Sequence, residues 1–130
     1  MKDRPMINKE GFWWSTHEPH LPKPIALSYK WTGRKEFLRA LSQIESSIEN
    51  YSLGKVNHQK GSSRCRLCEE HPMNGSAEYE LNCLGNTWRW PEGLRHYVSV
   101  HNVRPSLAFQ EFILTVFSAS TVVVKVKKKD

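Results

Sequence analysis

Two cysteines and two histidines in the middle of the chain have the spacing of a metal site. Two residues separate Cys65 from Cys68, and four separate His96 from His101. A C-x2-C pair followed by two histidines with three to five residues between them is a common way for a small domain to present four ligands to Zn²⁺. We therefore predict that these four side chains bind one Zn²⁺ ion per chain.

The predicted ligand set favours a structural ion over a catalytic one. Four protein ligands fill the tetrahedral shell of zinc, whereas a catalytic ion keeps one position for water or substrate. Cys83 competes for one place in the shell, and His71 is a weaker competitor. Because the use of Cys83 would displace a histidine, we interpret Cys83 as a buried free thiol.

The composition indicates why a small chain would need a metal. The chain has 130 residues, 38% of them hydrophobic, which predicts one domain with a modest core. It contains no run of about 18 apolar residues and no apolar signal-peptide centre at its start, so we expect no membrane association. We expect an intracellular, reducing compartment, cytoplasmic or nuclear, in which the three cysteines are thiolates or thiols rather than disulfides.

The net charge of +6 suggests nucleic-acid binding, but its distribution weakens that interpretation. Half of the excess lies in the last six residues, where four lysines and one aspartate sum to +3. A short lysine-rich end is typical of a solvated tail, with attraction to phosphate as the alternative.

Two segments that precede the metal ligands have to help position them. Residues 1–32 are rich in tryptophan and proline, which predicts an extended arm anchored by its aromatic side chains. Residues 33–53 are expected to form a helix that packs on the metal-bound region, because apolar side chains recur at steps of three and four. These side chains are Phe37, Leu41, Ile44, Ile48 and Tyr51.

The predicted ligands belong to a ββα unit at residues 61–102. A strand that alternates apolar and polar residues around Tyr79, a turn at Gly85-Asn86 and a returning strand at Thr87–Trp90 predict a short hairpin. A helix starting at Pro91 and Glu92 would carry both histidines. Residues five apart on an ideal helix differ by about 140°, so we expect its last turn to tighten or unwind. We expect the rings of Trp88 and Trp90 to cover the metal site.

The end of the chain is predicted to form a second flanking helix and a tail. Ser106 is a suitable N-cap for a helix over 106–117, while the β-branched run Thr121–Val124 in the tail 119–130 favours a strand or an apolar tail. The predicted fold class is α+β: a zinc-stapled domain at 33–118 with a C-x2-C knuckle, a short hairpin and a histidine-bearing helix. One helix lies on each side, and an extended arm precedes the domain.

Several short motifs resemble those of a known group of sequences. The motifs are C-R-L-C, N-G-S and W-R-W-P-E-G-L-R-H-Y-V-S-V-H-N-V-R-P, preceded by G-F-W-W-S. Together they are similar to a group of small proteins, mainly bacterial, whose function is not established, over roughly residues 11 to 114. The resemblance implies the zinc-binding architecture and no particular activity.

The sequence favours two non-enzymatic classes of function over an enzyme. The first is a non-enzymatic structural-zinc module that binds another macromolecule in an assembly or adaptor role, with a protein as the favoured partner. The second is a nucleic-acid-binding zinc protein. A DNA-binding finger has about twelve residues between its second cysteine and first histidine, whereas 27 residues, 69 to 95, lie between them here. Possible contacts to nucleic acid or to a partner are Arg64, Arg66, Arg89, Arg95 and Arg104.

The third class, a nuclease of the ββα-metal type, has the least support. Such a site needs a histidine general base on the strand before the helix and an open metal position. The strand here offers Trp88, Arg89 and Trp90 instead. We therefore expect no enzymatic activity.

Overall fold

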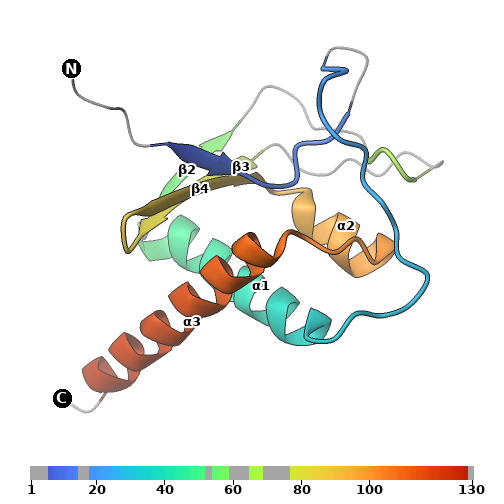
Figure 1. The fold of residues 1–130 in the computed structure, drawn as a ribbon. Helices are drawn as coiled ribbons and strands as arrows, with labels where there is room; N and C mark the ends of the chain where they lie inside the picture. The colour runs from blue at the N-terminus through green and yellow to red at the C-terminus, as the bar shows by residue number, and fades with distance from the viewer. Residues whose placement is uncertain (1–5, 15–17, 52–53, 59–64, 69–76, 129–130) are drawn as a thin grey trace, which may run out of the picture.

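The computed structural model describes residues 6–14, 18–51, 54–58, 65–68 and 77–128, with the side chains of 51, 58 and 120–128 excepted (Figure 1). Its elements, in chain order, are β1 (Ile7–Lys9), α1 (Arg34–Tyr51), β2 (Lys55–His58), β3 (Ala77–Cys83), β4 (Asn86–Pro91), α2 (Leu94–His101) and α3 (Leu107–Lys128). Within the described residues these make three helices and a four-stranded sheet, so the predicted α+β class is confirmed.

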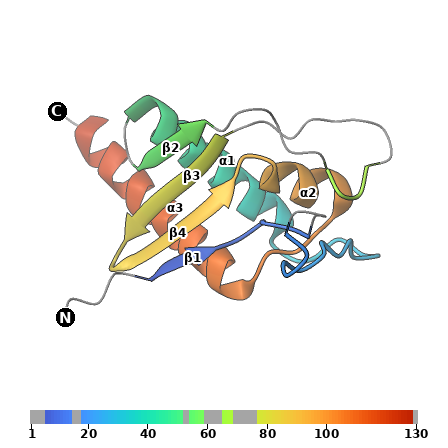
Figure 2. The same ribbon diagram turned by 90° about the horizontal axis from the view of Figure 1, so that it is seen from above.

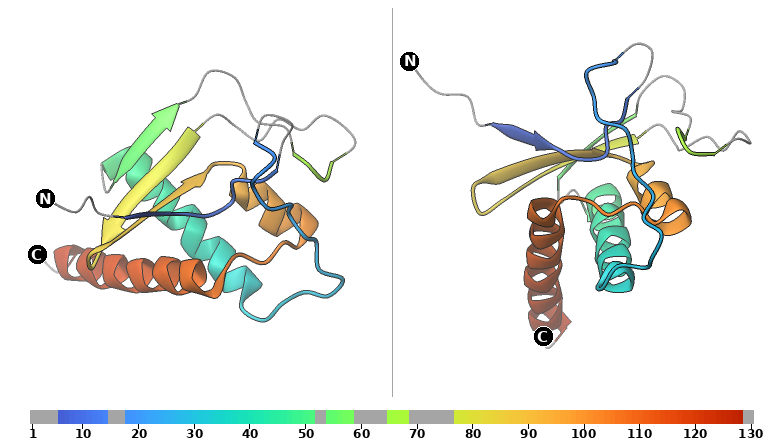
Figure 3. Two further views of the ribbon diagram at one scale, coloured as in Figure 1. Left: turned by 45° about the horizontal axis from the view of Figure 1, so that its top comes forward. Right: turned by 45° about the vertical axis from the view of Figure 1, so that its right-hand side comes forward.

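The sheet has the strand order β1-β4-β3-β2, which Figure 2 shows from above. β3 and β4 form the predicted antiparallel hairpin, β2 pairs antiparallel with β3, and β1 pairs parallel with β4. Helices α1 and α3 cover one face of the sheet, while α2 lies beyond its end (Figure 3). The molecule is therefore a two-layer domain with a separate structural region around α2.

The hairpin turn lies one residue earlier than predicted. Leu84 and Gly85 both have positive φ, 52° and 81°, and Cys83 pairs with Asn86 across the turn. Positive φ at both central residues is the signature of the type I′ turn that joins closely paired strands. Asn86 therefore belongs to β4.

The two tryptophans of β4 do not cover the metal site, so that expectation is wrong. Trp90 is fully buried, with its ring centroid 5.4 Å from that of Phe109 on α3, and Trp88 lies 5.2 Å from the same ring. Residues two apart on a strand share a face, and α1 and α3 occupy the face to which these rings point. The residues after Pro91 then lead the chain past the end of the sheet to α2.

Helix α2 starts later than predicted, at Leu94, with Gly93 as its N-cap. Pro91 still pairs with Glu78 as the last residue of β4, and the amide of Glu92 donates to the carbonyl of Ala77. Pro91 and Glu92 are therefore held by the hairpin, and the helix cannot begin until after them.

Helix α3 begins as predicted but runs much further. The hydroxyl of Ser106 accepts a hydrogen bond from the amide of Phe109 at 3.2 Å, as an N-cap does. The helix continues to Lys128, so the expectation of a strand or apolar tail at 121–124 is wrong. Its sequence contains neither proline nor glycine, and β-branched residues cost an established helix only about 0.5 kcal/mol each. In the described part of the chain, no helix combines the length and apolar character needed to cross a bilayer.

The N-terminal arm is extended, but it is more closely integrated than predicted. Its first part contains β1, an edge strand of the sheet, and Ala26 forms an isolated bridge with Val103 after α2. Between these points Trp13 packs against both the main core and a smaller cluster of Cys65, Tyr97 and Val103. The arm thus connects the sheet with the region around α2.

Candidate metal centre

The first half of the centre is the short segment 65–68, which presents two sulfur atoms. Cys65 is buried and Cys68 half-buried, and the amide of Leu67 donates to Sγ of Cys65 at 3.4 Å. The thiolate is the form of cysteine that binds metals. The segment lies against α2 at the right-hand side of Figure 1.

The second half of the centre is helix α2, whose last turn is wider than a regular α-turn. The amides of Asn102 and Val103 both donate to the carbonyl of Tyr97, and Asn102 adopts a left-handed conformation with φ 56°. This five-residue closure brings side chains five apart toward one side. The ring centroids of His96 and His101 are consequently 5.0 Å apart.

The two halves bring four donor atoms to one point. Sγ of Cys65 lies 3.3 Å from Nε2 of His101, and Sγ of Cys68 lies 3.3 Å from Nε2 of His96 and 3.0 Å from that of His101. All four atoms lie within 4.8 Å of one another. Zinc bonds of about 2.3 Å to sulfur and 2.0–2.1 Å to nitrogen would place adjacent sulfur and nitrogen atoms about 3.5 Å apart. The arrangement can therefore hold one metal ion after small changes in these distances.

The surroundings of His96 favour the protonation state that a metal ligand needs. Burial, and secondarily the neighbouring imidazole of His101, lowers the pKa of His96 below its ordinary value of 6.5. A neutral imidazole keeps a lone pair free for a metal ion, whereas an imidazolium does not.

Tyr97 joins the two halves of the centre, a role that the sequence did not reveal. Its hydroxyl oxygen accepts a hydrogen bond of 2.7 Å from the amide of Arg66, between the two cysteines. Burial raises the pKa of Tyr97 to about 12, so the phenol stays protonated. Its ring packs edge-on against Trp13, with centroids 5.6 Å apart. The side chain between the two histidines therefore fixes the cysteine segment on the helix.

Tyr97→Phe is expected to weaken metal binding by about tenfold, because outer partners of metal ligands typically contribute that much to affinity. The substitution keeps the ring but leaves the Arg66 amide without its acceptor. Competition with a chromophoric chelator measures the change. Tyr29→Phe, at an exposed tyrosine, is the control, and equal affinities of all three proteins would contradict this role of Tyr97.

The competing ligands do not join this group. Cys83 is a free thiol, as predicted, but it is half-buried rather than buried: it lies at the end of β3 and lines a cavity of about 450 Å³ together with Trp88 and Phe112. The group formed by the described residues does not include it. His71 lies outside the described residues.

Four of the five predicted contact arginines are described, and they are dispersed. Arg89 forms an ion pair with Glu80 at 2.6 Å, and Arg95 lies 3.6 Å from the buried carboxylate of Glu45. Arg66 donates to the backbone carbonyl of Trp14, and Arg104 lies 5.3 Å above the ring of Trp31. Arg64 lies outside the described residues. Of the four described arginines, Arg66 lies in the metal centre and the other three make contacts elsewhere, so these four do not form one ring of positive charge around the metal.

No family model, curated protein or solved structure matches this chain. The resemblance to a group of small bacterial proteins therefore stays a prediction, and the case for a metal site depends on the donor geometry itself.

Proposed function

We propose that the protein is a non-enzymatic module that is held together by one structural Zn²⁺ ion and binds another macromolecule. The observation that carries the proposal is the convergence of two sulfur and two imidazole donors within 4.8 Å. Two thiolates with two imidazoles form a donor set typical of tetrahedral zinc. Because thiolates must stay reduced, the proposal includes an intracellular, reducing compartment.

The small amount of apolar burial around the centre supports a structural role for the ion. Among the described residues, the cluster there has three buried members, Cys65, Tyr97 and Val103, and shares Trp13 with the main core. Few apolar contacts provide little free energy to hold the cysteine segment on α2. Metal ligation would supply what the packing lacks, since the binding free energy of a structural zinc ion is also folding free energy.

The absence of catalysis is part of the proposal. Four protein ligands would occupy the whole tetrahedral shell, leaving no position at which zinc activates water. On β4, where a ββα-metal nuclease needs its histidine base, the chain has Trp88, Arg89 and Trp90. Relationship to the small bacterial group would be consistent with this role, but it adds no activity.

A protein partner is favoured over direct nucleic-acid binding by the predicted arginines. Arg89 and Arg95 face carboxylates of Glu80 and Glu45, which reduces the charge they offer to phosphate. Charges of both signs in alternation are more typical of a protein-facing or solvated surface.

Cobalt substitution tests the closed ligand shell. With Co²⁺ in place of Zn²⁺, we expect the visible spectrum of a tetrahedral site with two sulfur and two nitrogen ligands, unchanged by azide or thiocyanate. His96→Ala should alter the spectrum because it removes a ligand, whereas Cys83→Ala should not. An anion-dependent shift, or metal-dependent cleavage of a nucleic acid by the purified protein, would overturn the non-enzymatic proposal.

A further inference from the structure

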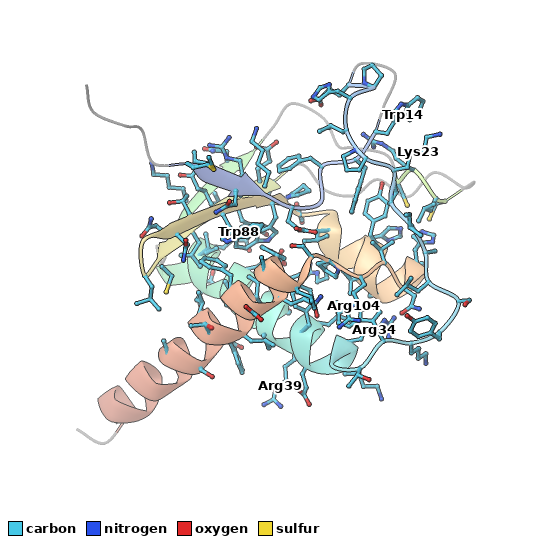
Figure 4. The ribbon with its side chains drawn as sticks, in the orientation of Figure 1. Trp14, Lys23, Arg34, Arg39, Trp88 and Arg104 are labelled. Carbon is cyan, nitrogen blue, oxygen red and sulfur yellow. The ribbon has the colours of Figure 1, made fainter. Side chains whose placement is uncertain are left out.

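Positive charge is concentrated where the arm meets the start of α1. Between residues 23 and 39 the sequence has five lysines and arginines but one acidic residue, Glu36. Figure 4 shows Arg34, Arg39 and Arg104 around the start of α1, with Lys23 further along the arm. Among the described residues, no carboxylate lies within 4.0 Å of Lys30, Lys35 or Arg104. These cations are thus available to an anionic partner.

Two of these charges occupy positions that are unfavourable for the isolated helix. Arg34 and Lys35 lie in the first turn of α1, where the helix dipole is positive, and Lys35 and Arg39 are like charges four residues apart. Arg34 is compensated, because its guanidinium donates to the carbonyls of Val98 and Ser99 at the negative end of α2. Lys35 has no such compensation among the described residues. Departures from local preference are most common at functional sites.

Exposed apolar side chains lie in the same region. Ile25, Tyr29 and Val100 are 71%, 62% and 60% exposed, respectively. The arm carrying the first two runs beside the end of α2, since the amide of Leu27 donates to the carbonyl of Asn102. The ring of Tyr29 is able to stack on a base, but neither stacking nor phosphate binding needs the exposed aliphatic groups of Ile25 and Val100. Apolar groups with charges around them are instead typical of protein interfaces.

The region is connected to the metal centre by direct contacts. Asn102 follows the ligand His101 directly, and its side-chain amide donates to the carbonyls of Leu27 and Tyr29. Arg104, two residues later, lies over the buried ring of Trp31. The metal site therefore sets the end of α2, and the end of α2 positions the arm. Pre-organised surfaces bind partners at a lower entropic cost.

We propose that this region binds an acidic, partly apolar segment of another protein. The proposed surface, called here the basic surface, consists of Ile25, Tyr29, Lys30, Lys35, Val100 and Arg104. The proposal rests on the proposed function as a binding module and specifies its partner. Carboxylates of the segment would face the lysines and the arginine, while its apolar side chains would cover Ile25, Tyr29 and Val100.

A labelled synthetic peptide of glutamate and leucine, arranged to form one acidic and one apolar face, tests the proposal with the full-length zinc-loaded protein. We expect it to bind at least about tenfold more tightly than an all-glutamate peptide or single-stranded DNA of equal length, because only it satisfies both kinds of contact. Lys30→Glu combined with Lys35→Glu should weaken binding by about tenfold or more. Ile25→Ser should weaken binding of this peptide but not of the all-glutamate one.

The control combines Lys9→Glu with Lys55→Glu, which changes the net charge equally on the two edge strands. Its peptide affinity should stay within about twofold of the wild type. Equal losses in both double variants, no peptide binding, or tighter binding of DNA would each overturn the proposal. Metal content and melting curves of every protein distinguish failure of the proposed basic surface from failure of the proposed structural-zinc function. Retained metal without peptide binding contradicts the basic surface. Peptide binding by a folded, metal-free protein contradicts the structural-zinc function.

Discussion

Cys65→Ser is expected to remove the metal and the cooperative unfolding transition together. Cys65 is the buried member of the four donors, and its sulfur also accepts the Leu67 amide. Structural zinc binding provides about 10–16 kcal/mol at neutral pH, which is of the same size as the total stability of about 5–15 kcal/mol typical of a small domain. Metal analysis after dialysis should give close to one zinc for the wild type and almost none for the variant.

A matched cysteine provides the control. Cys83→Ser removes a thiol that lies outside the donor group, so its zinc content should equal that of the wild type. Thermal unfolding followed by near-ultraviolet circular dichroism should keep one sharp transition in this control and lose it in Cys65→Ser. A Cys65→Ser protein with the wild-type melting curve would show that the fold does not depend on the metal.

The helices and the hairpin were predictable because their signals are local. The stripe of Phe37, Leu41, Ile44 and Ile48 is buried on α1, as its period of three to four residues predicts. The alternation around Tyr79 likewise gives β3. In each case the side chains that define the pattern are within one element, so the pattern does not depend on knowledge of the partner.

The edge strands were not predictable for the opposite reason. β2 has the sequence K-V-N-H and β1 has I-N-K, neither of which shows a periodic apolar pattern. β1 is a strand because it pairs with β4, about 80 residues away: Ile7 pairs with Thr87. Short edge strands depend on a long-range ladder for their conformation, and strand propensity depends strongly on such context.

The four candidate ligands were predictable from spacing, but their supporting contacts were not. The hydrogen bond from the Arg66 amide to Tyr97 joins residues 31 positions apart, and Trp13 reaches the same cluster from the arm. On an ideal helix the two histidines, five residues apart, would point in different directions. The amides of Asn102 and Val103 both donate to the carbonyl of Tyr97, and the wide last turn that results brings the histidines to one side. Spacing thus indicates which atoms bind a metal, while tertiary contacts determine how they are held.

A buried carboxylate between α1 and the sheet was also not foreseen. Glu45 is 2% exposed, and its Oε2 accepts a hydrogen bond of 2.9 Å from the indole of Trp90. Its Oε1 has no hydrogen-bond partner among the described residues and lies 3.6 Å from the guanidinium of Arg95. Burial raises the pKa of Glu45 from 4.5 to about 7 and outweighs the opposing effects of Trp90 and Arg95.

This environment makes the stability contributed by Glu45 depend on pH. The folded protein binds the proton more tightly than the unfolded chain, so the contribution is fully present below pH 4.5 and is lost as the pH rises through about 7. Over that interval the loss is on the order of 3 kcal/mol, because each pKa unit corresponds to about 1.4 kcal/mol. Protonation of the metal ligands at low pH acts in the opposite direction, so the wild type alone does not isolate the effect of Glu45.

Glu45→Gln isolates it, because glutamine keeps an acceptor for Trp90 and does not ionise. The difference in free energy of unfolding between the zinc-loaded variant and the wild type should shift in favour of the variant by about 2 kcal/mol between pH 5.5 and 8.5, because about 1.5 pH units of the interval up to the raised pKa lie above pH 5.5. Urea unfolding at a series of pH values measures this difference. Both proteins have the same metal ligands, so the contribution of the metal site to the free energy of unfolding cancels in the difference. Glu36→Gln, at an exposed position on α1, is the control for the change from glutamate to glutamine. A constant difference between Glu45→Gln and the wild type across this range would mean that Glu45 is already ionised in the folded protein at pH 5.5.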